Sequence, residues 1–146
     1  MEENKKTIDV TALGELLVDF TMNGQSEQGN PLFEACPGGA PCNVLAFLQK
    51  MEKKTAFIGK VGNDQFGKML KETIEEAGIH ASNLIFDNQV NTTLAFVHTF
   101  KWGQRLFFYR NPGADMMLTA AEVNEETINN QNIPFWHVIN DGRRRA

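Results

Sequence analysis

Two adjacent glycines, Gly38 and Gly39, stand directly before a run of good helix formers in the stretch PGGAPCNVLAFLQKM. A helix N-terminus leaves backbone N–H groups without partners and carries partial positive charge, so it favours electron-rich oxygens where the preceding backbone can come close. Glycine has no Cβ to block that approach. Pro41 suits the first helical position, and Asn43 adds an acceptor and two donors at the turn. These residue types predict a site for a polyhydroxylated ligand.

The same residues allow a purely structural interpretation. The glycines also suit a plain turn between a strand and a helix, in which Asn43 would serve only as a cap. Two other glycine segments fail as nucleotide sites. The segment from Gly59 to Gly62 lacks the Ser or Thr and the leading glycine of a P-loop, and Gly14 lacks the further glycines of a dinucleotide fingerprint.

Composition places the chain among soluble globular proteins. Its 146 residues are 42% hydrophobic and 22% charged with a net charge of −4, so one domain with a real core is expected over 1–146. Nucleic acid is not an expected partner, because the dense positive cluster Arg143–Arg145 is interpreted as a solvated tail. No apolar run predicts a membrane span. Cys36 and Cys42 are expected to be free thiols in a reducing cytoplasm.

The elements that must position the glycine turn follow from the hydrophobic pattern. An apolar run from Ile8 to Phe20 predicts one strand covered on both faces, which is typical of a parallel α/β sheet. The next expected elements are a short strand over 32–35, a helix over 41–51, a strand over 54–62, an amphipathic helix begun by Asp64 and ended by Gly78, and a strand over 83–87.

The hydrophobic period then changes to two. In NTTLAFVHTF the side chain of Phe96 alternates with its neighbours, and after a KWGQ turn Phe108 and Arg110 share one face of the segment RLFFYR. This pattern predicts a β-hairpin inserted into an α/β chain. The last expected elements are a helix over 119–131, begun by a capping box of Thr119 and Glu122, and a strand over 134–140.

Five ordered stretches between Ile8 and Leu118 resemble the ribokinase-like carbohydrate kinases of the PfkB family, most closely its bacterial fructokinase branch. They are GELLVDF, CPGGAPCNVLAFLQKM, AFIGKVGNDQFGKML, TTLAFVHTF and RLFFYRNPGADMML. The resemblance implies a ribokinase-like α/β fold, in which a parallel sheet is flanked by helices and a small β-sheet lid is inserted. The lid segments would be about 20–35 and 91–111. The lid would cover a small-molecule sugar and form the contact of a homodimer.

The resemblance also implies which residues bind the sugar. Asp19, at the end of the first strand, would accept hydrogen bonds from sugar hydroxyls, since a carboxylate can accept two at once. Gly38, Gly39 and Asn43 would contact the same sugar. The alternative for Asp19 is that it only begins the lid turn.

The hairpin would contribute the remaining contacts. Phe108 would cover the apolar side of the sugar while Arg110 reaches its oxygens, and Phe96 would line the same pocket. A solvated arginine and a core phenylalanine are the respective alternatives for Arg110 and Phe96.

The family transfers the γ-phosphoryl group of ATP to a sugar hydroxyl, with Mg²⁺ on the phosphates and a catalytic base from a GAGD-type motif. This sequence contains no such motif, so it predicts no catalytic, cofactor-binding or metal-binding residue. The chain is expected to be the N-terminal, sugar-binding part of a truncated kinase and to be inactive alone. The alternative is a non-catalytic sugar-binding or dimerising fragment. The segment 141–146, DGRRRA, is expected to be a disordered or non-native tail.

Overall fold

The computed structural model of the chain describes residues 7–100, 103–129 and 131–136. Within these residues the strands are β1 (Ile8–Leu13), β2 (Leu17–Gln25), β3 (Pro31–Gly38), β4 (Thr55–Gly62), β5 (His80–Asp87), β6 (Leu94–Phe100), β7 (Gly103–Tyr109) and β8 (Gln131–Trp136). The helices are α1 (Ala40–Lys50), α2 (Gln65–Glu76), α3 (Glu125–Asn129) and the 3₁₀ helices η1 (Ala114–Met117) and η2 (Ala120–Glu122). None of the helices in this described part is both long and apolar enough to cross a bilayer.

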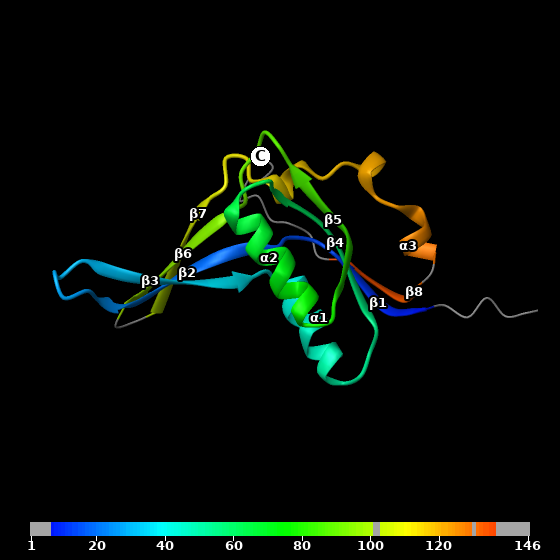
Figure 1. The fold of residues 1–146 in the computed structure, drawn as a ribbon, viewed down its shortest axis with the longest axis horizontal. Coiled ribbons are helices and arrows are strands. Elements are labelled where there is room, and N and C mark those ends of the chain that lie inside the picture. Colours follow the sequence, from blue (N-terminus) through cyan, green and yellow to red (C-terminus); the bar gives the residue numbers. More distant parts are fainter. Residues whose placement is uncertain (1–6, 101–102, 130, 137–146) are drawn as a thin grey trace, which may run out of the picture.

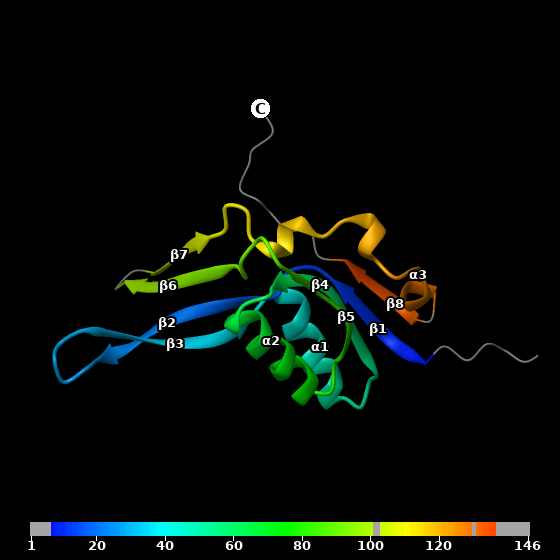
Figure 2. The ribbon, with the colours of Figure 1, turned by 45° about the horizontal axis from the view of Figure 1, so that its top comes forward.

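One sheet is entirely parallel, in the order β5-β4-β1-β8. Figure 2 shows α1 and α2 on one side of this parallel sheet and the segment from η1 to α3 on the other. The core lies between the parallel sheet and the two longer helices, where Phe57 of β4, Leu45 of α1 and Leu70 of α2 are each fully buried. Because both faces of β4 are covered, all of its residues are buried, and six of its eight residues are apolar or glycine.

The second sheet, here called the projecting sheet, has the order β3-β2-β6-β7 and extends away from the helices (Figure 1). β2 pairs with β3 in the antiparallel sense and with β6 in the parallel sense, while β6 and β7 form the hairpin that the period of two predicts. The expected α/β architecture with an inserted β-sheet is therefore confirmed.

The prediction of one strand from Ile8 to Phe20 is wrong. β1 ends at Leu13 in the parallel sheet, and β2 begins at Leu17 in the projecting sheet. The hydrophobic pattern does not reveal the break because the first residues of β2 are buried like those of β1. Asp19 is therefore the third residue of β2 and does not lie at the carboxyl end of a parallel strand, as the sequence had suggested.

The prediction of one helix over 119–131 is also wrong, although the predicted capping box of Thr119 and Glu122 forms. Glu122 accepts hydrogen bonds from the backbone N–H and the hydroxyl of Thr119, both at 2.9 Å. The chain then becomes extended at Val123, and the side chain of Asn124 accepts a hydrogen bond from the N–H of Glu126 at the start of α3. An asparagine that bonds the backbone locally competes with a continuous helix, so two short helices replace one long helix.

The last predicted strand is only partly described. β8 begins at Gln131, three residues before the expected start, while 137–140 of that strand and the expected tail 141–146 lie outside the described residues.

Asp64 begins α2, as predicted, and also connects the helix to the projecting sheet. Its carboxylate accepts hydrogen bonds from the N–H of Gly67 and from both the N–H and the hydroxyl of Thr92, each at 2.8 Å. Thr92 lies two residues before β6. Burial acts to raise the pKa of Asp64, but these hydrogen bonds outweigh it and lower the pKa below 3.8. The charged carboxylate thus fixes the base of β6 against α2.

Replacing Asp64 by Asn removes this charge while keeping the size of the side chain. Because the folded-state pKa is lowered, the stabilisation is complete above about pH 5 and is lost as the pH falls through the folded pKa. At neutral pH we expect D64N to lower the free energy of unfolding by about 1–2 kcal/mol. Urea unfolding measured from pH 7 to pH 3 tests this.

The matched control is Glu72→Gln, which removes an exposed charge from the same helix and should change stability by less than about 0.5 kcal/mol. A D64N loss that stays constant down to pH 3 would show that the charge of Asp64 is not what stabilises this junction.

Candidate functional site

Asp19 and Gly38 meet where β2 and β3 leave the helical layer. A Cβ added to Gly38 would lie 2.8 Å from Cγ of Asp19 and would collide with its Oδ2, so the carboxylate rests directly over the bare glycine backbone. Burial raises the pKa of Asp19, and no donor among the described residues offsets that burial. The structure therefore brings together two residues that the sequence assigned to one site, and it leaves a carboxylate there that a hydroxyl donor would stabilise.

Gly39 is held close to the chain segment that links β1 to β2. It is the N-cap of α1 with a φ of 121°, and a Cβ at this position would lie 2.5 Å from the carbonyl oxygen of Glu15. The side chain of Glu15 accepts a hydrogen bond from the N–H of Ala40 at 3.3 Å, which places negative charge at the N-terminus of α1. Packing against Glu15 therefore explains why Gly39 must be glycine.

The first turn of α1 holds a buried thiol and an exposed amide. Burial, and then the charge of Glu15, raises the pKa of Cys42 to about 12, so this thiol stays protonated. Asn43 is exposed, and its N–H donates to the carbonyl of Gly39 at 3.2 Å. Because Gly39 is the N-cap and Glu15 accepts the N–H of Ala40, the interpretation of Asn43 as a pure cap is wrong.

Phe108 shares a face of the projecting sheet with Asp19. Asp19 of β2 is in register with Ala95 of β6, which is in register with Phe108 of β7, and directly paired residues place their side chains on the same face. Arg110 follows on the same side, with its guanidinium carbon 5.5 Å from the centre of the Phe108 ring. Asp19, Gly38, Phe108 and Arg110 form the candidate site, named here the Asp19 face.

Phe96 lies on the opposite face. It is in register with Phe20, whose ring stacks on it at a centroid distance of 5.0 Å, and it also contacts the rings of Phe33 and Tyr109 at 5.6 and 5.3 Å. The structure therefore does not bring Phe96 together with Asp19 and Phe108. The aromatic cluster around Phe96 packs on the face of the projecting sheet opposite Asp19.

Arg110 is held by residues that the sequence analysis missed. Its guanidinium forms an ion pair with Asp115 of η1, whose other carboxylate oxygen accepts a hydrogen bond from the hydroxyl of Thr93 at 2.5 Å. The side chain of Arg110 is only 10% exposed, so the interpretation of a solvated arginine is wrong. The available sequence signal was an acidic residue five positions after Arg110 in the otherwise uncharged stretch NPGADMML.

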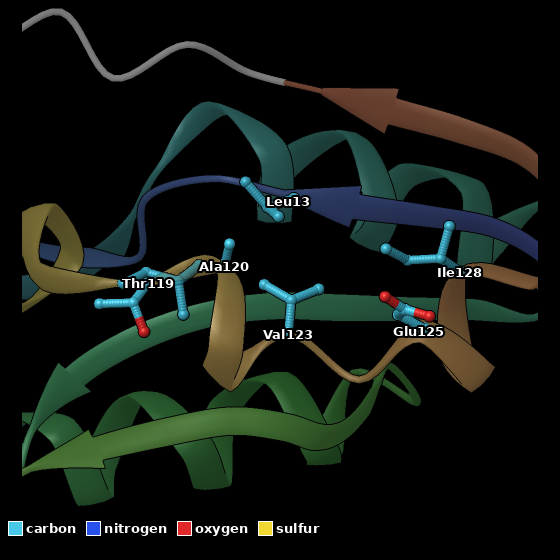
Figure 3. A pocket seen from close by; sticks show the side chains of 7 residues that line it. Leu13, Thr119, Ala120, Val123, Glu125 and Ile128 are labelled. Carbon is cyan, nitrogen blue, oxygen red and sulfur yellow. The ribbon is translucent and has the colours of Figure 1, made fainter.

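A cavity of about 390 Å³ lies elsewhere, between the end of β1 and the segment from η2 to α3 (Figure 3). Its lining consists mostly of apolar side chains: Leu13, Leu118, Thr119, Ala120, Val123, Glu125 and Ile128. None of the site residues predicted from the sequence lines this cavity, and its walls offer few polar groups to a sugar.

The cofactors that the family resemblance implies are ATP and Mg²⁺. No group of three or more His, Cys, Asp or Glu side chains in this part of the chain is placed to hold a metal ion. The glycine-containing segment from Gly59 to Gly67 serves the cap of α2 and the turn before it, as the sequence indicated. No step of phosphoryl transfer is therefore assigned to these residues.

A parallel α/β sheet that carries a projecting β-sheet is also the fold of solved sugar kinases. The fructokinase of Xylella fastidiosa aligns with a TM-score of 0.82 and 30% identity over 90% of this chain and 41% of that protein. An uncharacterized sugar kinase from Pyrococcus horikoshii, solved in complex with ATP, aligns with a TM-score of 0.79 and 27% identity over 87% of this chain and 42% of that protein.

Sequence comparison gives the family directly. The model of the pfkB family carbohydrate kinases matches residues 7–138, so the chain belongs to this family. Fructokinase-1 of Zea mays and Fructokinase-2 of Solanum lycopersicum are each 44% identical to it over 122 residues, which are 82% of this chain. The chain spans 38% and 37% of the length of these two relatives.

The approach of Gly39 to Glu15 can be tested with two glycine substitutions. Gly24→Ala introduces a side chain at a φ of 85° with nothing within 4 Å, and we expect strain alone to cost about 1 kcal/mol. Gly39→Ala adds a collision with backbone to a similar strain, so its loss in free energy of unfolding should be about 3 kcal/mol or more. Urea unfolding of both variants measures the difference, and equal losses would contradict the close approach.

Proposed function

We propose that this chain forms the sugar-binding part of an ATP-dependent sugar kinase that phosphorylates fructose. The observation that carries the proposal is the half-buried carboxylate of Asp19, which lies over the backbone of Gly38 and shares a sheet face with Phe108. The names of the fructokinase relatives support the choice of fructose over other sugars.

The chemistry of this face suits a polyhydroxylated ligand. Sugar hydroxyls that donate to Asp19 would replace the solvent it has lost and stabilise its charged form, at about 1.5–3 kcal/mol for each hydrogen bond. The ring of Phe108, which is 52% exposed, offers an apolar surface to the C–H side of the sugar. Asn43 and the backbone at Gly38 and Gly39 would contribute the remaining polar contacts.

Phosphoryl transfer itself would require protein beyond these residues. The sequence has no GAGD-type motif to supply the catalytic base, and the described residues offer no metal site. We therefore propose that ATP and Mg²⁺ bind to a part of the enzyme outside this chain, and that the chain alone binds sugar without turnover.

We further propose that the projecting sheet pairs two copies of the protein in the cytoplasm. The face opposite Asp19 exposes several apolar side chains: Met22, Phe33, Phe107 and Tyr109. Burying such a contiguous apolar surface favours association. The free state of Cys36 and Cys42 agrees with a reducing compartment.

Isothermal calorimetry of fructose with the wild-type chain and with Asp19→Asn tests the sugar site. We expect wild type to bind and D19N to bind about 10- to 100-fold more weakly, since one charged hydrogen bond is worth about 1.5–3 kcal/mol. Binding by wild type should also weaken as the pH falls through the pKa of Asp19, which burial raises above 3.8, while D19N should not respond to that titration.

Glu27→Gln is the matched control, because it removes an exposed charge from the turn of the projecting sheet far from Gly38. It should leave fructose affinity unchanged. Equal fructose affinities of D19N and wild type at neutral pH would reject Asp19 as a sugar ligand.

Sedimentation equilibrium tests the pairing of the projecting sheets. Phe107→Ser removes an exposed ring from the proposed contact, and we expect it to weaken dimerisation by about 10-fold or more. Phe47→Ser, which removes an exposed ring from α1, should leave the dimer intact. A larger effect of the α1 variant would place the contact elsewhere.

A further inference from the structure

A buried ion pair with Asp115 holds Arg110 of the Asp19 face. Asp115 is 2% exposed and its side chain is completely buried, while the side chain of Arg110 is 10% exposed. One carboxylate oxygen of Asp115 accepts a hydrogen bond from the guanidinium of Arg110, and the other accepts one from the hydroxyl of Thr93. Each oxygen of this carboxylate therefore has a hydrogen-bond partner, and that arrangement fixes its orientation.

The backbone is shaped to admit this cluster. A Cβ added to Gly113 would collide with the hydroxyl of Thr93 and would lie 2.8 Å from Oδ1 of Asp115 and 3.1 Å from Cγ of Arg110. Thr93 precedes β6, Arg110 follows β7, and Asp115 lies in η1. The cluster therefore joins the ends of both hairpin strands to the segment that returns to the parallel sheet.

Arg110 keeps one donor unused within this cluster. Its Nε is buried and has no hydrogen-bond partner among the described residues, although the guanidinium is held against the ring of Phe108. A buried donor without a partner costs free energy unless a ligand or water satisfies it. The guanidinium is thus held by Asp115 and by the ring of Phe108, and its buried Nε remains unpaired among the described residues.

The charges of these groups define what the pocket favours. Arg110 contributes one positive charge, which the buried carboxylate of Asp115 cancels, and Asp19 leaves the face with a net negative charge. An anionic sugar would meet that negative charge, and Arg110 could not compensate it because Asp115 already neutralises the guanidinium, whereas a neutral sugar would keep the hydrogen bonds.

We propose that Asp115 is a positioning residue of the sugar pocket, which fixes Arg110 against Phe108 and cancels its charge, so that the pocket admits neutral sugars and rejects sugar acids. This inference rests on the proposed sugar site. It assigns to Asp115 a role in selectivity that a purely structural ion pair would not have.

The test compares the affinities of fructose and gluconate, a neutral sugar and a sugar acid, for the full 146-residue chain by calorimetry. Wild type should bind fructose at least about 10-fold more tightly than gluconate. In Asp115→Asn, Arg110 is no longer neutralised, so fructose should bind about 10-fold more weakly and gluconate about 10-fold more tightly. The added gluconate affinity should decrease with rising salt, because it is electrostatic.

Thr93→Val provides a second variant that keeps every charge. It frees one oxygen of Asp115, and we expect fructose affinity to fall about threefold while gluconate remains excluded. This variant decides the question if D115N does not fold, since unchanged fructose affinity in T93V would then overturn the inference.

The possible failures are distinguishable. Equal weakening of both sugars in D115N would show a merely structural ion pair and overturn the inference while leaving the sugar site in place. If wild type binds gluconate as tightly as fructose, the inference is overturned and the sugar site remains. If neither sugar binds to wild type, the proposed function fails and the inference fails with it.

Discussion

The junction between the two sheets depends on one close backbone approach, between Gly39 and the carbonyl of Glu15. Here the chain passes from β1 in the parallel sheet to β2 in the projecting sheet, and the carboxylate of Glu15 accepts a hydrogen bond at the N-terminus of α1. A side chain at position 39 would push these two backbones apart. The contact thereby sets where β2 begins, and with it where Asp19 is placed.

The projecting sheet then divides the aromatic residues between two faces with different tasks. Strand register puts Phe108 on the same face as Asp19, and it puts Phe96 on the opposite face with Phe20. Stacked and edge-on ring contacts add stability beyond the burial of area, so the cluster around Phe96 stabilises the projecting sheet on the face opposite Asp19. Asp64 and Thr92 complete this support from the side of α2.

Local signals in the sequence predict much of this fold. Asp64 was recognisable as a cap because the signal for a helix start is contained within a few residues, and the hairpin was recognisable from its period of two. The break between β1 and β2 could not be recognised, because the buried residues of β1 and the buried first residues of β2 have the same apolar pattern. The prediction of one long helix over 119–131 was wrong because the side chain of Asn124 bonds the backbone N–H of Glu126 and a new helix begins there. Periodicity alone does not show this interruption.

The candidate site shows the same division. Asp19 and Gly38 were assigned to one site from the sequence and lie in contact. Which face of the sheet carries Phe108 and which carries Phe96 depends on how β2, β6 and β7 are aligned, and no local pattern specifies this alignment. The pairing of Arg110 with Asp115 depends on the return of the chain after β7, so it too is a tertiary feature.

The central claim, that sugar binds on the Asp19 face at the glycine bend, is tested most directly by following the backbone amides of the ¹⁵N-labelled chain by NMR during a fructose titration. The account predicts saturable shifts at Asp19, Gly38 and Phe108. Shifts confined to the cavity lined by Leu13 and Ile128, or no shifts at saturating fructose, would contradict it.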